Sequence, residues 1–401
     1  MSANQARTIE QGGPWLEVFG DDVEATAPSQ SSGEPGPLAD FTFAIKDLIA
    51  VAGRTLTAGS PVLADAAPET MTAPIVESLV ARGARALGTV TLHEFAFGVT
   101  GLNKAFGTAP NPKAPGRCPG GSSSGSASAV ADGSARIAIG TDTGGSVRIP
   151  AAFCGVTGFK PAFDTYSADG VFPLSPTLDH VGFLARDVED IITVHTSLTT
   201  EAVTPAPPTR IAVIHADLDP AEAPVRAAIT AALDRIVDAL GAEVVDVGWP
   251  DPEAAFVAST TIMSSEAAAV HRKLRSIHED RYGADILARL DAGAVLTTTE
   301  VAAAYQLRDE LTAQVMSALH EVDLVITPTV RLEAPTIEDA ADRAIPGRIV
   351  ANTRLGNVVG LPAISIPVPS GGLPVGLQLT GATNAGVLGA AAAIEGVLGS
   401  D

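Results

Sequence analysis

The sequence is poor in positive charge. It holds 25 lysines and arginines against 46 aspartates and glutamates in 401 residues, a formal net charge of −21. Nucleic acids and anionic lipid surfaces are bound through basic faces, which this composition does not favour. We therefore expect neither nucleic acid nor membrane as a partner. A small, neutral molecule is the substrate that the composition favours.

Cysteines and long apolar runs are also scarce. The two cysteines, Cys118 and Cys154, make no C-x-x-C motif and are expected to be reduced thiols. No run of 18 apolar residues occurs, and the first twenty residues lack the basic and apolar regions of a secretory signal. The seven histidines form neither H-x-H nor H-E-x-x-H. These absences predict a cytoplasmic protein with no metal and no cofactor.

Apolar patterns alternate between strand and helix along the chain. "FTFAIKDLIAVAG" from Phe41 reads as strand, "APIVESLVARGA" has helical spacing, and "RALGTVTL" follows as a short apolar strand. The β-α-β pattern recurs around residues 124–142 and 209–248, and apolar strands return in "DLVITPTV" and "PAISIPV". This pattern predicts a single α/β domain with a central mixed sheet sandwiched by helices.

Two turns near the middle of the first half are rich in glycine and serine. "GGSSSGSASA" begins at Gly120, and "GTDTGGS" ends at Ser146. A flexible linker is disfavoured because the first stretch leads into an apolar helix and strand. A phosphate-binding loop is disfavoured because Ser126 stands where the motif requires lysine.

A third interpretation is the nucleophile elbow of serine hydrolases. Residues 121–125 satisfy G-x-S-x-G with Ser123 as nucleophile, and histidines that could complete a triad follow at His271, His278 and His320. The stretch before this turn, "APNPKAPGRCP", is loop-like, whereas an elbow directly follows a buried strand. The pattern is short, so this alternative stays open on the residues alone.

A longer set of motifs resembles the amidase signature family. The set comprises "FAIKDLI" around Lys46, "PGGSSSGSASAV", "GTDTGGSVRIPAAFCGVTGFKP", "SPTLDHVGFLARDVED" and "GLPAISIPVPSGGLPVGLQLTGA". The resemblance spans about residues 40–195 and 320–382. It implies the amidase-signature fold, with Ser146 as nucleophile, Ser122 as a bridging serine on a cis peptide, and Lys46 as base.

The chemistry of these residue types agrees with those implied roles. Desolvation disfavours a charged lysine, so burial can make Lys46 neutral and able to accept a proton. A hydroxyl both donates and accepts, so Ser122 can pass the proton of Ser146 to this amine. Glycines in "DTGGS" allow backbone N–H groups to converge on one point, which predicts an oxyanion hole. Its expected members are Thr143, Gly144, Gly145 and Ser146.

Other residues are expected to support the site. Ser123 is expected to hydrogen-bond within its turn, and Asp142 to form a buried pair with Arg148 that braces the second turn. Phe95, Phe97 and Val99, in "EFAFGVTGLN", are candidate walls of a substrate pocket, with core packing as an equal alternative. The cysteines lack the electropositive neighbour that thiolate activation needs.

The resemblance implies an amidase that hydrolyses the C–N bond of a small, neutral primary carboxamide through an acyl-enzyme. The similarity extends to indoleacetamide hydrolases and malonamidase. An A-type subunit of an amidotransferase and a catalytically silent amide-binding sensor are the alternatives, and a homodimer is left open. We expect an extended lead-in over 1–40 and an amidase domain over 41–401. Within the domain we expect a signature core at about 41–195, a helical substrate region at about 253–320 and a C-terminal return over 321–401.

Overall fold

One large mixed sheet forms the centre of the protein. The computed structural model describes residues 13–20, 36–342 and 344–399. Within these ranges, eleven strands lie in the order β1-β3-β2-β4-β6-β5-β10-β11-β9-β7-β8. The strands are β1 (Trp15–Val18), β2 (Thr42–Lys46), β3 (Arg85–Val90), β4 (Ile137–Asp142), β5 (Thr157–Lys160), β6 (His180–Ala185), β7 (Arg210–Val213), β8 (Glu243–Val244), β9 (Leu324–Pro328), β10 (Ala363–Val368) and β11 (Val375–Thr380).

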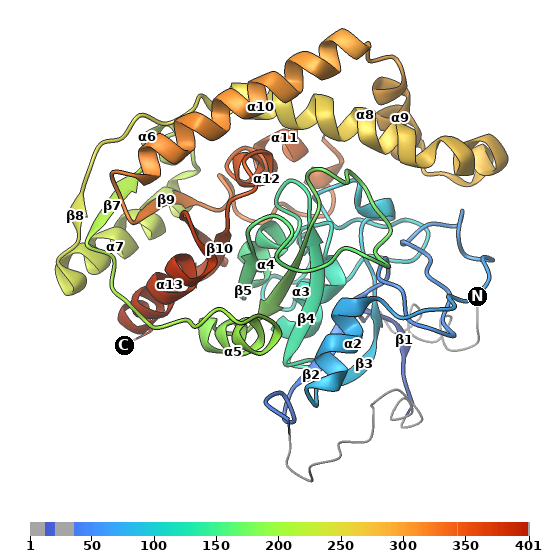
Figure 1. The fold of residues 1–401 in the computed structure, drawn as a ribbon, viewed down its shortest axis with the longest axis horizontal. Coiled ribbons are helices and arrows are strands. Elements are labelled where there is room, and N and C mark those ends of the chain that lie inside the picture. Colours follow the sequence, from blue (N-terminus) through green and yellow to red (C-terminus); the bar gives the residue numbers. More distant parts are fainter. Residues whose placement is uncertain (1–12, 21–35, 343, 400–401) are drawn as a thin grey trace.

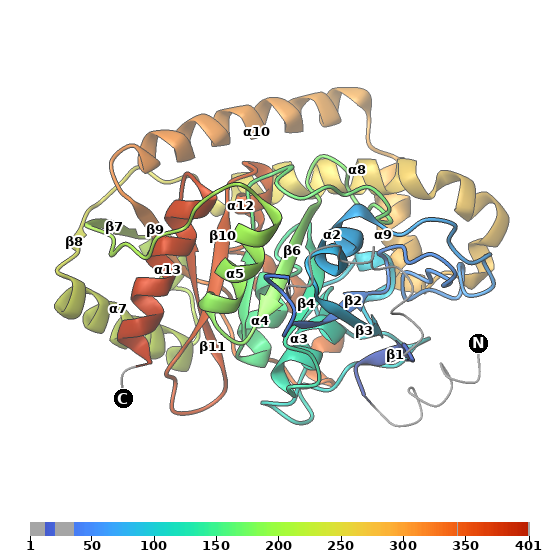
Figure 2. The same cartoon turned by 60° about the horizontal axis from the view of Figure 1, so that its bottom comes forward.

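Helices cover this sheet on both faces and extend beyond one edge (Figures 1 and 2). The α-helices are α2 (Pro74–Ala81), α3 (Ser124–Ala131), α4 (Arg148–Cys154), α5 (Val188–Leu198), α6 (His215–Leu218), α7 (Ala223–Leu240), α8 (Pro252–His278), α9 (Ala284–Ala294), α10 (Thr298–Leu319), α11 (Ile345–Val350), α12 (Arg354–Val358) and α13 (Asn384–Leu398). Short 3₁₀ turns occur at Glu94–Ala96, Glu279–Arg281 and Asp339–Ala341. The prediction of a single α/β domain with a central mixed sheet is confirmed, since strands from both halves of the chain share one sheet.

The two faces of the sheet carry side chains of different size. Small residues such as Ala44 and Ala138 face α3 and α4, where they pack with Ala127 and Ala151. The opposite face carries larger residues, among them Ile45, which pack against α2, α5, α7 and α13. Helix α3 approaches so closely that a Cβ atom on residue 125 would lie 2.5 Å from the carbonyl oxygen of Thr91. The small residues of the serine run therefore permit a helix to lie directly against the sheet.

The lead-in expected over residues 1–40 contains one ordered element. Strand β1 lies inside residues 1–40 and pairs antiparallel with β3 at the sheet edge. Residues 26–35 of the stretch rich in proline and glycine fall outside the described residues, and residues 37–40 form a turn.

The helical region expected in the middle of the chain is formed by α8, α9 and α10. Figures 1 and 2 show α8 and α10 running beside one another along one side of the sheet, and α12 packs against α8. None of the helices in the described part of the chain is long and apolar enough to cross a membrane.

Candidate active site

The end of β2 places Lys46 beside the serine run. Strand β2 is parallel to β4, so both strands end at the same edge of the sheet. Lys46 Nζ donates hydrogen bonds to Ser122 Oγ and to Thr141 Oγ1, each at 2.8 Å. Both serine turns and the lysine therefore meet at one place.

Burial lowers the pKa of this lysine and so favours its uncharged form. Lys46 has no exposed surface, and desolvation lowers its pKa to about 7, although the charges of Asp142 and Asp179 oppose the shift. An isolated lysine has a pKa of about 10.4. A substantial fraction of Lys46 is therefore uncharged at neutral pH and able to accept a proton.

Ser122 and Ser123 have different environments. The peptide bond between Gly121 and Ser122 is cis. Ser122 presents its hydroxyl to Lys46, whereas Ser123 Oγ donates to the carbonyl oxygen of Thr141 and accepts from its N–H. Ser123 thus joins its turn to β4.

Ser146 lies in the second turn, between β4 and α4. Its carbonyl oxygen accepts a 3.2 Å hydrogen bond from the N–H of Ser123, which links the two turns directly. The side chain is buried but retains 4% exposure. Ser146 is thus held next to the serine run.

A buried ion pair holds the second turn. Asp142 accepts hydrogen bonds from the backbone N–H groups of Gly145, Val147 and Arg148, and from the Arg148 guanidinium at 2.9 and 3.1 Å. Burial alone would raise the pKa of Asp142, but Arg148 holds that pKa well below its ordinary value. Asp142 and Arg148 form the buried pair that their sequence positions suggested.

One of the four residues predicted to form the oxyanion hole has its backbone N–H already bonded. The N–H of Gly145 donates to Asp142 Oδ1 at 2.8 Å, so this donor is already engaged. Gly145 has φ +124°, and a Cβ there would lie 2.3 Å from Thr353 Oγ1. The position therefore requires glycine for shape. Thr143, Gly144 and Ser146 stay as predicted donors.

Four further residues contact the site but were not among the predicted site residues, although Thr141 and Asp179 lie within motifs quoted above. Thr141 accepts from Lys46, and Asp179 accepts from Thr143 Oγ1 at 2.6 Å. Burial raises the pKa of Asp179 to about 6. Thr353 Oγ1 donates to the carbonyl oxygen of Gly144, and Asn357 Nδ2 donates to Asp142. The last two residues follow the signature turns by about two hundred positions, and no motif marks them.

The three candidate pocket residues have separate surroundings. Phe95 is 1% exposed and its ring lies among those of Phe172, His271 and Tyr282, which is core packing. The ring of Phe97 lies 5.5 Å from the guanidinium of Arg289. Val99 packs against an apolar cluster that includes Ile149, Phe153 and Ile349.

The histidines named for an elbow do not contact Ser123 in the part of the chain that the structure describes. His271 hydrogen-bonds to Tyr282, and burial lowers its pKa to about 4. The structure also brings together no group of three or more metal-binding side chains among the described residues. Cys118 and Cys154 are unpaired and buried, and burial raises the pKa of both thiols.

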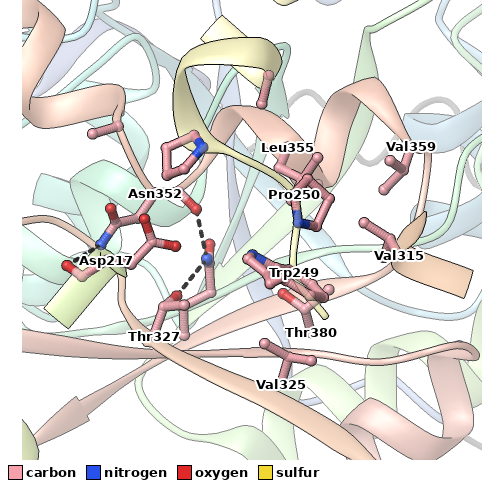
Figure 3. A pocket seen from close by; sticks show the side chains of 15 residues that line it. Asp217, Trp249, Pro250, Val315, Val325, Thr327, Asn352, Leu355, Val359 and Thr380 are labelled. Carbon is pink, nitrogen blue, oxygen red and sulfur yellow. Dashed lines mark hydrogen bonds between the residues drawn. The ribbon is translucent and has the colours of Figure 1, made fainter. Parts of the chain in front are cut away.

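A small pocket lies apart from these residues, between β9, β11 and α12 (Figure 3). Asp217, Trp249, Thr327 and Asn352 are among its lining residues, and its free volume is about 20 Å³. That space holds roughly one water molecule. Gln378 links the pocket to the site, since its side chain bonds Thr327 and the Asn352 carbonyl and accepts from Arg148. A residue that lines this pocket therefore also helps to hold Arg148 in place.

Comparison with known proteins identifies the class. A family model described as Amidase matches residues 3–386. The chain is 33% identical to an indoleacetamide hydrolase of Pseudomonas savastanoi, over 95% of this chain and 88% of the relative. It is 34% identical to the A-type subunit of a glutamyl-tRNA(Gln) amidotransferase of Halobacterium salinarum, over 90% of this chain and 96% of that relative. A crystal structure of an amidase superposes with a TM-score of 0.89 at 31% identity, covering 98% of this chain and 94% of that one.

Fold and motifs thus define an enzyme that acts on amide C–N bonds. The chain belongs to the amidase family, the amidase-signature enzymes that its motifs resemble.

Proposed function

We propose that the protein is a free-standing amidase that hydrolyses a small primary carboxamide to a carboxylate and ammonia. The observation that carries this proposal is the 2.8 Å hydrogen bond from Lys46 Nζ to Ser122 Oγ, in a buried site where the pKa of the lysine is about 7. A neutral amine next to a hydroxyl is a general base with a proton path. Ser146, linked to the same turn, supplies the nucleophile.

The proposed reaction proceeds in two halves. Ser146 Oγ attacks the amide carbon as its proton moves to Ser122, whose own proton moves to Lys46 Nζ. The relay then runs backward and protonates the leaving nitrogen, so that the C–N bond breaks and ammonia departs. Water next attacks the acyl-enzyme and gives its proton to the relay, which returns it to Ser146 Oγ. The net change is amide plus water to carboxylic acid plus ammonia.

The tetrahedral intermediate carries a negative oxygen that must be stabilised. We assign this task to backbone N–H groups of Thr143, Gly144 and Ser146, because Asp142 engages that of Gly145. Loss of one such donor typically costs about 3 kcal/mol of transition-state stabilisation. Arg148 contributes indirectly, since its bonds to Asp142 fix the turn that presents these groups.

Membership of an amidotransferase complex is the main competing function, because relatives of that name align over nearly the whole chain. The net charge of −21 favours the free-standing enzyme, since a tRNA-bound assembly gains from positive surface. We also propose a cytoplasmic location, supported by the two unpaired cysteines.

Ammonia release from a panel of primary amides tests the function. We expect turnover in the purified wild-type chain and its loss, by a factor on the order of 10⁴, in Ser146→Ala and Lys46→Ala. His271→Ala, His278→Ala and His320→Ala serve as controls that should keep activity. A sensor that only binds amides would be stabilised by them against heat without releasing ammonia.

A covalent probe separates the two candidate nucleophiles. A phosphonofluoridate reagent should label one serine stoichiometrically, and peptide mass mapping should place the label on Ser146. Attachment to Ser123 would instead support the elbow and overturn the relay.

A further inference from the structure

Arg354 lies beside the nucleophile turn without an acidic partner. A Cβ atom on Gly144 would lie 3.7 Å from Arg354 Cγ and 3.4 Å from the Cε atom of Met263. The Arg354 guanidinium donates to Thr260 Oγ1 and lies 4.5 Å from the ring centroid of Phe256. Its Nε is buried with no hydrogen-bond partner, and among the described residues no carboxylate forms an ion pair with it. The cation is thus held by an aromatic ring and a hydroxyl.

Arg289, on α9, is a second cation of this kind. Its guanidinium lies over the ring of Phe97, and its Nε is buried and also unpartnered. Burial, followed by the charge of Arg289, lowers the pKa of Arg354 to about 10. The charges of Arg289 and Lys46 both contribute to lowering the pKa of His93, in which burial is the largest cause. Arg289, Arg354 and the catalytic lysine therefore share one electrostatic neighbourhood.

The carboxylates around this neighbourhood have other partners. Asp179 accepts from Thr143 Oγ1 and from two backbone N–H groups, at residues 174 and 175. Glu266 accepts from Ser175, Thr177 and Tyr305. Asp285 is mostly exposed and lies 3.8 Å from His93. Its negative charge raises the pKa of Arg289, but by less than burial lowers it.

An unpaired, desolvated guanidinium is unfavourable, and a second one nearby increases that penalty. A paired arrangement such as that of Arg148 shows how this chain holds a cation whose role is structural. Arg354 and Arg289 lack such pairing, and Arg354 borders the turn that would receive the substrate. An anionic group on the substrate would supply the missing partner, and a planar carboxylate matches the fork of a guanidinium.

We propose that the substrate is an amide that also carries a carboxylate, with Arg354 binding that carboxylate and Arg289 adding a second positive charge. This inference rests on the proposed amidase function and narrows its substrate class. Because Arg354 lies next to Gly144, only a few bonds separate the carboxylate from the amide. The overall acidity of the chain favoured a neutral substrate, but the charges that border the site act at shorter range than the net charge.

Matched substrates test the inference. Succinamate and butyramide have similar size and the same amide, but only succinamate is charged; malonamate and propionamide form a second pair. We expect wild-type kcat/KM to be at least about 100-fold higher for the charged member of a pair. Arg354→Met should reduce kcat/KM for the charged amide by about 100-fold, mainly through KM, and change the neutral amide by less than about threefold. Arg354→Lys should restore part of the loss, and Arg289→Met should cause a loss of about tenfold.

Arg275→Met is the matched control, since Arg275 also lies on the helical region but pairs with Glu279 and Asp291. It should leave the ratio of the two kcat/KM values unchanged. An equal loss on charged and neutral amides in Arg354→Met would overturn the inference while leaving the amidase function standing.

Calorimetry with Ser146→Ala separates binding from turnover. Titration with succinamate should show binding that Arg354→Met, added to Ser146→Ala, removes, whereas butyramide should bind no better than the buffer control. If wild type releases no ammonia from any amide, the proposed function fails. In that case the absence of binding that depends on Arg354 would also overturn the carboxylate assignment.

Discussion

Arg148 and Arg354 are two arginines near the same turn, and the protein treats them in opposite ways. The Arg148 guanidinium donates to Asp142, Asn357 and Gln378, and it has no exposed surface. The Arg354 guanidinium has a hydroxyl and an aromatic ring for partners, and an unpartnered Nε. Helix α12 carries Arg354 and also Asn357, which bonds Arg148, so one short helix contributes to the surroundings of both arginines. A fully bonded buried cation fixes the backbone of the turn, whereas the incompletely bonded cation beside it is the one that we propose binds the substrate carboxylate.

The largest effect that would test this comparison is on stability. Arg148→Met should lower the free energy of unfolding by about 3–5 kcal/mol, because it leaves the Asp142 carboxylate buried without its partner. Arg354→Met should change it by less than about 1 kcal/mol or raise it, since a desolvated charge is removed. Urea denaturation followed by circular dichroism measures both. Equal destabilisation by the two variants would show that Arg354 is a structural residue like Arg148.

The contrast also shows what the sequence could predict. The residues from Gly121 to Arg148 form one contiguous stretch, so their motifs indicate the turns, the candidate nucleophile and the ion pair. Strands with clear apolar runs, such as β4 and β9, were predicted for the same reason. By contrast, β1, β5, β6 and β11 were not predicted as strands, because they are short or interrupted by glycine or polar residues and acquire their pairing from distant partners.

Long-range partners account for the rest of the site. Asn357 contacts Asp142 across 215 positions, and Arg354 lies beside Gly144 although about two hundred positions separate them in the chain. No spacing rule connects residues so far apart. The net charge could not predict these contacts either, because it adds up the charges of the whole surface. A bound substrate interacts mainly with the few charges that lie within about one Debye length of it.

The next effect is on the pH dependence, and it tests whether the buried lysine is the base. In the proposed relay only the neutral form of Lys46 is active, so kcat/KM should rise about tenfold per pH unit below the lysine pKa of about 7 and level off above it. Asp179 raises that pKa, so Asp179→Asn should move the rising limb to lower pH. Steady-state rates of ammonia release between about pH 5 and 10 measure the limb. A limb that stays unchanged in Asp179→Asn would argue for a different base.

The lowered pKa of Lys46 also makes the stability of the fold depend on pH. The folded lysine loses its proton near pH 7, whereas the unfolded lysine keeps it to about pH 10.5. The unfolded state therefore binds more protons between these values, and the contribution of Lys46 makes stability rise with pH across that window. Lys46→Met should remove this part of the slope, as measured by urea denaturation at several pH values.

The smallest expected effect concerns the two cysteines. It tests whether these buried thiols, unlike the buried Lys46, take no part in the reaction. Cys154 ends the helix that begins at Arg148, and its thiol donates to the Pro119 carbonyl oxygen at 3.3 Å. Burial raises the pKa of Cys118 to about 12 and that of Cys154 further, whereas burial lowers the pKa of Lys46. A thiol in that state is neither a nucleophile nor a target for alkylation.

Iodoacetamide at about pH 8 should therefore leave ammonia release intact, and Cys118→Ala and Cys154→Ala should each change kcat/KM by less than about threefold. Mass spectrometry of the treated protein checks that the thiols stayed unmodified. Complete inactivation that coincides with alkylation of one cysteine, and that the corresponding alanine variant escapes, would mean that this thiol borders the substrate site.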